Sequence, residues 1–198
     1  WTFAGQPRRE AVSGPGETPF VQALARLREL LAGLEGAPPI TAVAHRVVHG
    51  GEDFRDSVLV TDAVLERLAR LNSLAPLHQP HNLAGIRSFR QAFPALPQVA
   101  CFDTAFHAGL SEVASAFALP TALTEQGVRR YGFHGLSYHY IMDTLQERSP
   151  RAQGRVLMAH LGNGASLCAA RAGRSVATTM GFSALDGLMM GTRSGTLD

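Results

Sequence analysis

Apolar residues recur every three to four positions in two stretches near the start of the chain, which predicts two amphipathic helices. The first covers residues 21–34, with Thr18 or a neighbour as its cap and Pro38-Pro39 at its end. The second begins at Thr61-Asp62 and has its apolar face between 64 and 71. Residues 1–16 have no clear period and are rich in Gly, Pro and charge, so we expect a loop or the end of a strand.

Residues 40–48 alternate in a way that predicts a strand, with His45, Val47 and His49 on one face and Arg46 and Val48 on the other. The two histidines would lie about 13 Å apart along a strand, so we expect no zinc site. The guanidinium of Arg46 can donate two hydrogen bonds to a carboxylate or phosphoryl group. Val48 can form an apolar surface for a short alkyl group. The alternative is an arginine at a strand end that pairs with an acid.

A second, buried strand is predicted from Pro97 to Phe102, and it ends at Asp103-Thr104. Open α/β sheets place ligand groups at the carboxyl ends of parallel strands, so Asp103 is a candidate site residue. Upstream, two prolines within 74–81 are expected to break the preceding helix and to hold His78 in a rigid loop, as a donor or as mere loop decoration. Asn82 is predicted to cap a helix that ends near Phe93.

A short helix is predicted at 111–117, followed by an aromatic, glycine-punctuated turn at 129–135. His134 is expected to open a helix that runs to about Gln146. An imidazole near a helix start, with two arginines nearby, suits a developing negative charge. A core histidine beneath a loop is the alternative.

Two strands, 156–161 and 165–170, flank Gly162-Asn163-Gly164 and predict a hairpin. The glycines would let backbone N–H groups approach an anion, and Asn163 adds an amide. A tight turn without a ligand is the alternative. The segment 181–195 that follows contains four glycines, two methionines and Arg193, and it is a plausible wall for an anionic substrate.

Composition narrows the chemistry of this 198-residue chain, which is 45% hydrophobic and therefore able to bury a core. All its basic residues are arginine, so phosphate chemistry here cannot use a Walker or Schiff-base lysine. The arginines are scattered, which argues against nucleic acid as a partner. No apolar run reaches the roughly 18 residues of a membrane span. Cys101 and Cys168 lie in apolar runs, as expected for reduced thiols of a cytoplasmic protein, although a disulfide between them stays possible.

Six segments in this order resemble the acetate kinase (acetokinase) family: HRVVHGGE, LAPLHQPHNLAGI, VACFDTAFH, RRYGFHGLS, HLGNGAS and TTMGFSALDGLMMGTRSG. The resemblance implies an α/β fold of the acetate and sugar kinase, Hsp70 and actin type, which is ribonuclease H-like. It implies two domains, incomplete in this chain: 1–105 from the N-terminal acyl-kinase domain, and 106–198 from the start of the C-terminal nucleotide-binding domain. The family's N-terminal phosphate-binding turn and most of its C-terminal domain would lie outside the chain.

The resemblance also implies a role for each matching residue. Asp103, His134 and Arg193 would be catalytic. The acyl substrate would be bound by Arg46, Val48, Leu77, His78, Phe133 and Ala184. The phosphates of ATP would be bound by His160, Leu161, Gly162, Asn163 and Gly164.

The function implied is transfer of the γ-phosphoryl group of ATP to acetate, giving acetyl phosphate and ADP reversibly, with Mg²⁺ held mainly by residues outside this chain. A propionate or butyrate kinase and a silent ATP-binding regulatory module are the alternatives. The full-length protein would be a cytoplasmic homodimer, and the isolated chain would be inactive.

Four positions depart from the family pattern. Leu136-Ser137-Tyr138 stands where Thr-Ser-His is usual, which removes one imidazole from the surroundings of the site. Ala184 replaces a common proline and Ala177 a frequent aspartate. The loss of proline loosens one wall of the acyl pocket. We therefore expect the departures to affect the choice of acid more than the phosphoryl transfer itself.

Overall fold

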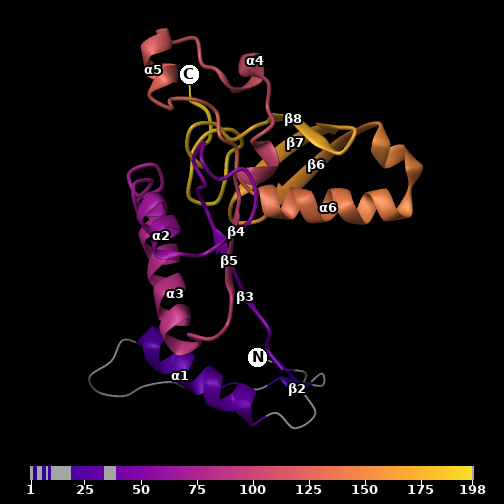
Figure 1. The fold of residues 1–198 in the computed structure, drawn as a ribbon. Coiled ribbons are helices and arrows are strands. Elements are labelled where there is room, and N and C mark those ends of the chain that lie inside the picture. The colour runs from indigo at the N-terminus through magenta and orange to yellow at the C-terminus, as the bar shows by residue number, and fades with distance from the viewer. Residues whose placement is uncertain (1, 4–5, 8, 10–18, 34–38, 198) are drawn as a thin grey trace.

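The computed structural model describes residues 2–3, 6–7, 9, 19–33 and 39–197 (Figure 1). The predicted cap Thr18, the end of the first helix at 34, Pro38 and most of the segment 1–16 lie outside these ranges. The elements in chain order are β1 Thr2–Phe3, β2 Gln6–Pro7, α1 Pro19–Ala32, β3 Val43–Val47, β4 Val58–Leu59, α2 Asp62–Ala69, α3 Gln79–Ala92, β5 Gln98–Phe102, η1 Ala105–His107, α4 Glu112–Ser115, α5 Thr121–Glu125, α6 Gly135–Arg148, η2 Pro150–Gln153, β6 Arg155–Leu161, β7 Ala165–Arg171 and β8 Arg174–Thr178.

The first sheet has the order β3-β5-β4, with β3 and β5 parallel and β4 antiparallel to β5. Helices α2 and α3 lie beside it in Figure 1. The apolar faces that the 3.6-residue period predicts are buried against the sheet. Leu68 of α2 and Ile86 of α3 are fully buried in one cluster with Val47 and Phe102. Arg46 pairs in register with Cys101, so the carboxyl ends of β3 and β5 lie together.

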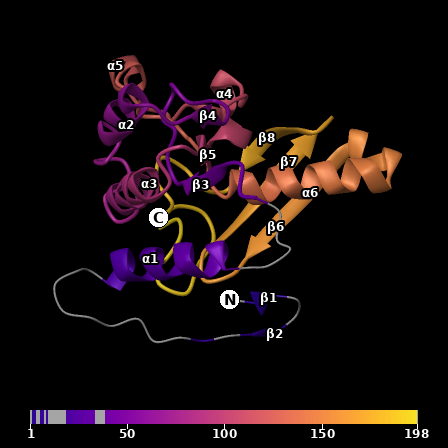
Figure 2. The same ribbon diagram turned by 60° about the horizontal axis from the view of Figure 1, so that its bottom comes forward.

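The second sheet is antiparallel, with the order β6-β7-β8. Both views show α6 along this sheet (Figures 1 and 2), where Tyr138 and Met142 of the helix pack on Met158 and Cys168. The predicted hairpin of β6 and β7 is confirmed. Strand β8 was not predicted, because Arg174–Thr178 has a single large apolar residue. Both cysteines are free thiols.

The structure corrects the expected start of α3. The helix begins at Gln79, so Pro80 lies in its first turn rather than breaking a helix. Proline is tolerated there because the first N–H groups of a helix have no intrahelical acceptor. Asn82 lies inside the helix and does not cap it; its Oδ1 accepts from the N–H of Val48 at 3.0 Å.

Three further differences concern the extent of the elements. Strand β3 ends at Val47, and residues 47–50 are all buried, so the two-face alternation does not extend to His49. Helix α4 has four residues, with Ser111 as its cap, and α5 was not predicted. Thr61 caps α2 as expected, accepting from the N–H of Val64. No described helix is both long and apolar enough to cross a membrane.

Two histidines of the core join the sheets to the turn at 129–135. His107 contacts Ser175 Oγ at 2.8 Å through Nδ1 and the Phe133 carbonyl at 3.0 Å through Nε2. His49 Nδ1 accepts from the N–H of Gly51, and its ring meets that of Tyr131 edge-on. Burial lowers the pKa of each histidine to about 4, so both are neutral at neutral pH.

We expect these histidines to make the free energy of unfolding rise with pH between about 4 and 6.5. In that window the unfolded chain binds protons that the folded chain excludes, so stability is lost as the pH falls below 6.5. Each histidine contributes up to about 3 kcal/mol over the window. Urea unfolding of the chain across this range measures the slope.

His107→Gln keeps an acceptor and a donor but does not titrate. It should therefore reduce the slope of the unfolding free energy against pH by the contribution of about one proton. His139→Gln on α6, whose side chain is 62% exposed, is the control for the substitution itself. A wild-type slope in His107→Gln would contradict this account.

Candidate active site

Arg46 and Asp103 form an ion pair where β3 and β5 end. Arg46 Nε lies 3.1 Å from both oxygens of Asp103, and Nη2 lies 2.6 Å from Oδ2. The Asp103 side chain is 3% exposed and that of Arg46 62%. The hydrogen bond to Asp103 is the main cause that raises the pKa of Arg46. A buried carboxylate therefore fixes a guanidinium whose outer edge stays open to a ligand.

His134 lies beside this pair because α6 starts against the end of β5. The N–H of Gly135 donates to the Asp103 carbonyl at 2.8 Å, and a Cβ at Gly135 would collide with that carbonyl. The preceding residue, His134, caps the helix with a left-handed φ of 59°. This uncommon conformation directs the imidazole toward Ser166, whose Oγ lies 2.8 Å from Nδ1.

The bend of the β6–β7 hairpin meets His134 and Arg193. An added Cβ on Gly164 would lie 2.7 Å from Arg193 Nη2 and 3.3 Å from His134 Nε2. The ring of His160 stacks on that of His134 with centroids 4.0 Å apart. Three elements far apart in the sequence thus bring a glycine, a guanidinium and an imidazole together.

His134 is uncharged at this place. Its pKa is lowered to about 4, first by burial and then by His160, Arg46 and Arg193, which are close enough to disfavour a further positive charge. The imidazole can therefore present one N–H and one lone pair rather than two donors. Its environment is cationic without the histidine itself being a cation.

The segment after β8 folds back onto the hairpin and positions Arg193. Arg193 Nη1 donates to the Ala184 carbonyl at 2.7 Å, and the N–H of Gly191 donates to the Asn163 carbonyl at 3.2 Å. Leu161, Gly162 and Asn163 remain exposed at the bend. Exposed backbone at a glycine-flanked bend beside an arginine can bind an anion such as the phosphates of ATP.

An apolar cluster lies next to the ion pair. Its buried members are Val48, Ala75, Tyr131, Phe133 and Met180, and Phe182, Ala184 and Met190 pack against it. The structure therefore brings together three of the residues predicted for the alkyl pocket.

The two remaining residues predicted to bind the acyl group have exposed side chains. Leu77, two residues after Ala75 of the cluster, is 77% exposed. His78 is exposed at the start of α3. A role for either residue in substrate binding stays a prediction.

Sequence reasoning missed the residues that hold the two imidazoles. Ser166 bonds His134, Ser137 Oγ lies 3.0 Å from His160 Nδ1, and Tyr138 bonds Ser166. A serine inside a strand and a tyrosine inside a helix give no sign of a site. The departure at 138 from the family pattern was the one available signal.

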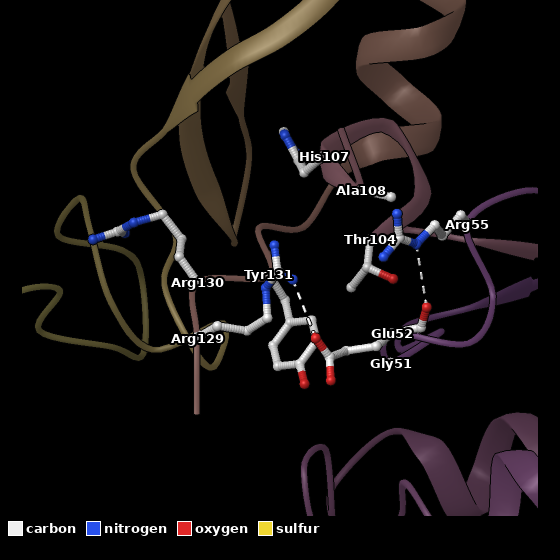
Figure 3. Close-up of a pocket in the computed structure, with 9 residues that line it drawn as sticks. All are labelled: Gly51, Glu52, Arg55, Thr104, His107, Ala108, Arg129, Arg130 and Tyr131. Atoms are coloured by element: carbon white, nitrogen blue, oxygen red, sulfur yellow. Dashed lines mark hydrogen bonds and ion pairs between the residues drawn. The ribbon is translucent and has the colours of Figure 1, made fainter. Parts of the chain in front are cut away.

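The pocket drawn in Figure 3 shares Tyr131 with the apolar cluster. None of the candidate site residues line this pocket. It is lined by Gly51, Glu52, Arg55, Thr104, His107, Ala108, Arg129, Arg130 and Tyr131. Arg129 pairs with Glu52 at 3.1 Å, as Figure 3 shows, and Arg130 with Asp186 at 3.4 Å. The Arg129 and Arg130 side chains are 21% and 24% exposed, whereas that of Arg46 is 62% exposed, so we place the candidate site at Arg46, His134 and Arg193 instead.

The site's fit to a metal ion depends on Asp103. Both Asp103 oxygens accept from Arg46, so this carboxylate is not free to hold Mg²⁺ in the structure. Within the described residues, no group of three or more His, Cys, Asp or Glu side chains could hold a metal ion.

Comparison with known proteins identifies the family. The model of the acetokinase family matches residues 9–198. The chain belongs to the acetokinase family. Its fold, as the resemblance implied, is the α/β fold of this family's solved structures: a propionate kinase from Francisella tularensis aligns with a TM-score of 0.85 at 42% identity, over 90% of this chain and 47% of that one.

Relatives within the family carry two substrate names. An acetate kinase from Rhodopseudomonas palustris is 61% identical over 161 residues, which is 80% of this chain and 40% of that protein. A propionate kinase from Citrobacter rodentium is 50% identical over 183 residues, 89% of this chain and 45% of that protein. The chain thus spans less than half the length of these relatives, whose names give two different acids.

Gly164 offers a direct test of how tightly the site is built. Gly164→Ala in the full-length protein should lower turnover at least about tenfold, because the new methyl group displaces Arg193 or His134. Gly162→Ala, at the same bend, meets nothing closer than 3.6 Å and should lower turnover less.

Gly109→Ala, whose Cβ would have no neighbour within 4 Å, controls for the loss of glycine itself. Steady-state kinetics with ATP compares the three variants. Equal effects at 162 and 164 would show that the close approach to Arg193 has no role.

Proposed function

We propose that the full-length protein transfers the γ-phosphoryl group of ATP to acetate, giving acetyl phosphate and ADP in a reversible reaction. The observation that carries this proposal is that His134 and Arg193 meet at the glycine bend of a hairpin, with Arg46 close enough to His134 to lower its pKa. Membership of the acetokinase family supports it. A coupled assay of ADP release by the full-length protein, with formate, acetate, propionate and butyrate, tests it, and activity with none of them would overturn it.

Arg46 binds the carboxylate of the acid in this mechanism. Asp103 holds the guanidinium in place and leaves its outer edge for the substrate. A carboxylate is already ionised at neutral pH, so its oxygen attacks the γ-phosphorus without a general base. The bond from the γ-phosphorus to the bridging oxygen breaks, and that oxygen leaves with its electron pair as part of ADP.

Arg193 and neutral His134 donate hydrogen bonds to the transferring phosphoryl group. Catalysis of this transfer consists mostly of alignment and charge stabilisation, which preorganised donors supply. The exposed, glycine-flanked bend at residues 161–164 binds the ATP phosphates, with Asn163 adding a side-chain amide. Mg²⁺ neutralises phosphate charge when bound, and we infer that its protein ligands come mainly from residues beyond this chain.

The domain assignment follows from the same proposal. Residues 1–105 belong to the acyl-binding domain and 106–198 begin the nucleotide-binding domain, so the reacting groups meet where the two adjoin. The full-length protein is a cytoplasmic homodimer on this proposal, and the 198-residue chain alone is inactive. A silent regulatory module is disfavoured because Arg46, Asp103, His134 and Arg193 are all present.

Propionate is the second candidate substrate, favoured by the wall of the apolar cluster. Ala184 packs against the cluster that contains Val48 and Phe133, at a position where the family commonly has proline. The smaller side chain leaves room for about one to two methylenes, each worth roughly 0.8 kcal/mol of binding. Relatives named propionate kinase are consistent with this reading.

Arg193→Ala in the full-length protein should lower kcat about 10²-fold or more and change the KM for ATP little. The reason is that Arg193 is assigned to charge that develops during transfer. Arg174→Ala, which removes an exposed arginine at the start of β8, is the control. A near-normal kcat with a raised KM for ATP would contradict the assignment.

Ala184→Pro should raise the ratio of kcat/KM for acetate over that for propionate by about fourfold per methylene excluded. Ala184→Val should move the ratio in the same direction, because it fills the same space without changing the backbone. Kinetics with both acids measures the ratio. A ratio that stays at the wild-type value in both variants would place Ala184 outside the pocket.

A further inference from the structure

A buried chain of hydrogen bonds runs from α6 to the candidate site. The Tyr138 hydroxyl lies 2.5 Å from Ser166 Oγ, and Ser166 Oγ lies 2.8 Å from His134 Nδ1. Tyr138 and Ser166 are both fully buried. The chain ends at the histidine whose Nε2 faces Gly164 beside Arg193.

We propose that Tyr138 is a positioning residue that acts through Ser166 to hold His134 as the tautomer with its proton on Nε2. In this arrangement Tyr138 donates to Ser166, Ser166 donates to Nδ1, and Nε2–H points at the hairpin bend. The consequence for catalysis rests on the proposed kinase function. The direction of the hydrogen bonds does not.

The hydrogen count sets this direction. The Tyr138 hydroxyl carries one hydrogen, and a buried hydroxyl hydrogen needs an acceptor. Burial raises the pKa of the Tyr138 phenol more than the Ser166 hydrogen bond lowers it, so the hydroxyl keeps its proton. Among the residues that the structure describes, Ser166 Oγ is the side-chain partner given for that hydroxyl.

The opposite direction leaves a group unsatisfied. If His134 Nδ1–H donated to Ser166, and Ser166 to Tyr138, the phenolic hydrogen would be buried without an acceptor. Such a loss shifts the ratio of two tautomers by about 10- to 100-fold. The tautomer with Nε2–H is therefore the one that satisfies all three residues.

The tautomer decides what His134 can do at the site. With hydrogen on Nε2, a neutral imidazole donates to a phosphoryl oxygen; with hydrogen on Nδ1, it offers that oxygen a lone pair and repels it. Stacking on His160 and the neighbouring Arg46 and Arg193 disfavour protonation of the ring. The phenol of Tyr138 carries no positive charge. It can therefore fix the tautomer of His134 without adding a cation next to Arg46 and Arg193.

The direct test is the tautomer itself, observed in the full-length protein with ¹⁵N-labelled histidine. A two-bond ¹H–¹⁵N spectrum, assigned with His134→Gln, should show a protonated Nε2 and an unprotonated Nδ1 for His134. In Tyr138→Phe the spectrum should show a mixture of tautomers. A wild-type His134 with its proton on Nδ1 would overturn the proposal, whether or not the protein is a carboxylate kinase.

Kinetics gives the second readout. Tyr138→Phe keeps the packed ring and should lower kcat about two- to tenfold, the usual effect of one lost hydrogen bond, with little change in the KM for ATP. Tyr140→Phe removes the same atom from the same helix at a residue that is 73% exposed, and it should behave as wild type.

Ser166→Ala should lower kcat at least as much as Tyr138→Phe, and adding Tyr138→Phe to it should cause no further fall, because both lie on one path. Fully additive losses would show that Tyr138 acts independently of Ser166 and would overturn the proposal. An inactive wild type would defeat the proposed function alone, since the tautomer spectrum remains readable.

Discussion

The ion pair between Arg46 and Asp103 is the interaction on which the candidate site depends. Parallel pairing of β3 and β5 places the two residues at one edge of the sheet, and Asp103 is buried there with both oxygens on the guanidinium. A buried carboxylate without a partner is strongly unfavourable, so Asp103 holds Arg46 in one geometry. The same residue accepts from Gly135 through its carbonyl and thereby fixes where α6 begins and where His134 lies.

Neutrality of the histidines is the second constraint. Burial lowers the pKa of His134 to about 4, together with the neighbouring His160, Arg46 and Arg193. The site can thus bind anions through arginine and donate through a neutral imidazole. Because the chain contains no lysine, guanidinium forks and backbone N–H groups take the place of flexible ammonium groups.

Much of this arrangement was predictable from sequence because it follows local rules. Alternation and apolar period predicted β3, β5, α2 and the hairpin, and the position of Asp103 after a buried strand marked it as a site residue. The start of α3 was wrong because proline can begin a helix as well as end one. Strand β8 was missed because its pairing with β7, rather than its own apolar residues, makes it a strand.

The hydrogen bonds of Ser166 and Tyr138 could not be predicted, since they join residues 28 positions apart through tertiary packing. Exposure is equally non-local. Leu77, which the resemblance assigns to the acyl pocket, is 77% exposed in this structure, and its role stays a prediction. Local patterns place a backbone, whereas the partners of a buried side chain are determined by the whole fold.

Asp103→Asn in the full-length protein tests the central claim most directly, because it removes the charge that holds Arg46 while keeping the shape of the side chain. The measurement is kcat/KM for acetate and the KM for ATP, with Asp62→Asn at the exposed Arg90 pair as the control. The account predicts a fall of at least about tenfold in kcat/KM for acetate, as for a lost charge-assisted hydrogen bond, and a KM for ATP within about twofold of wild type. An unchanged kcat/KM for acetate, or a loss confined to ATP binding, would contradict it.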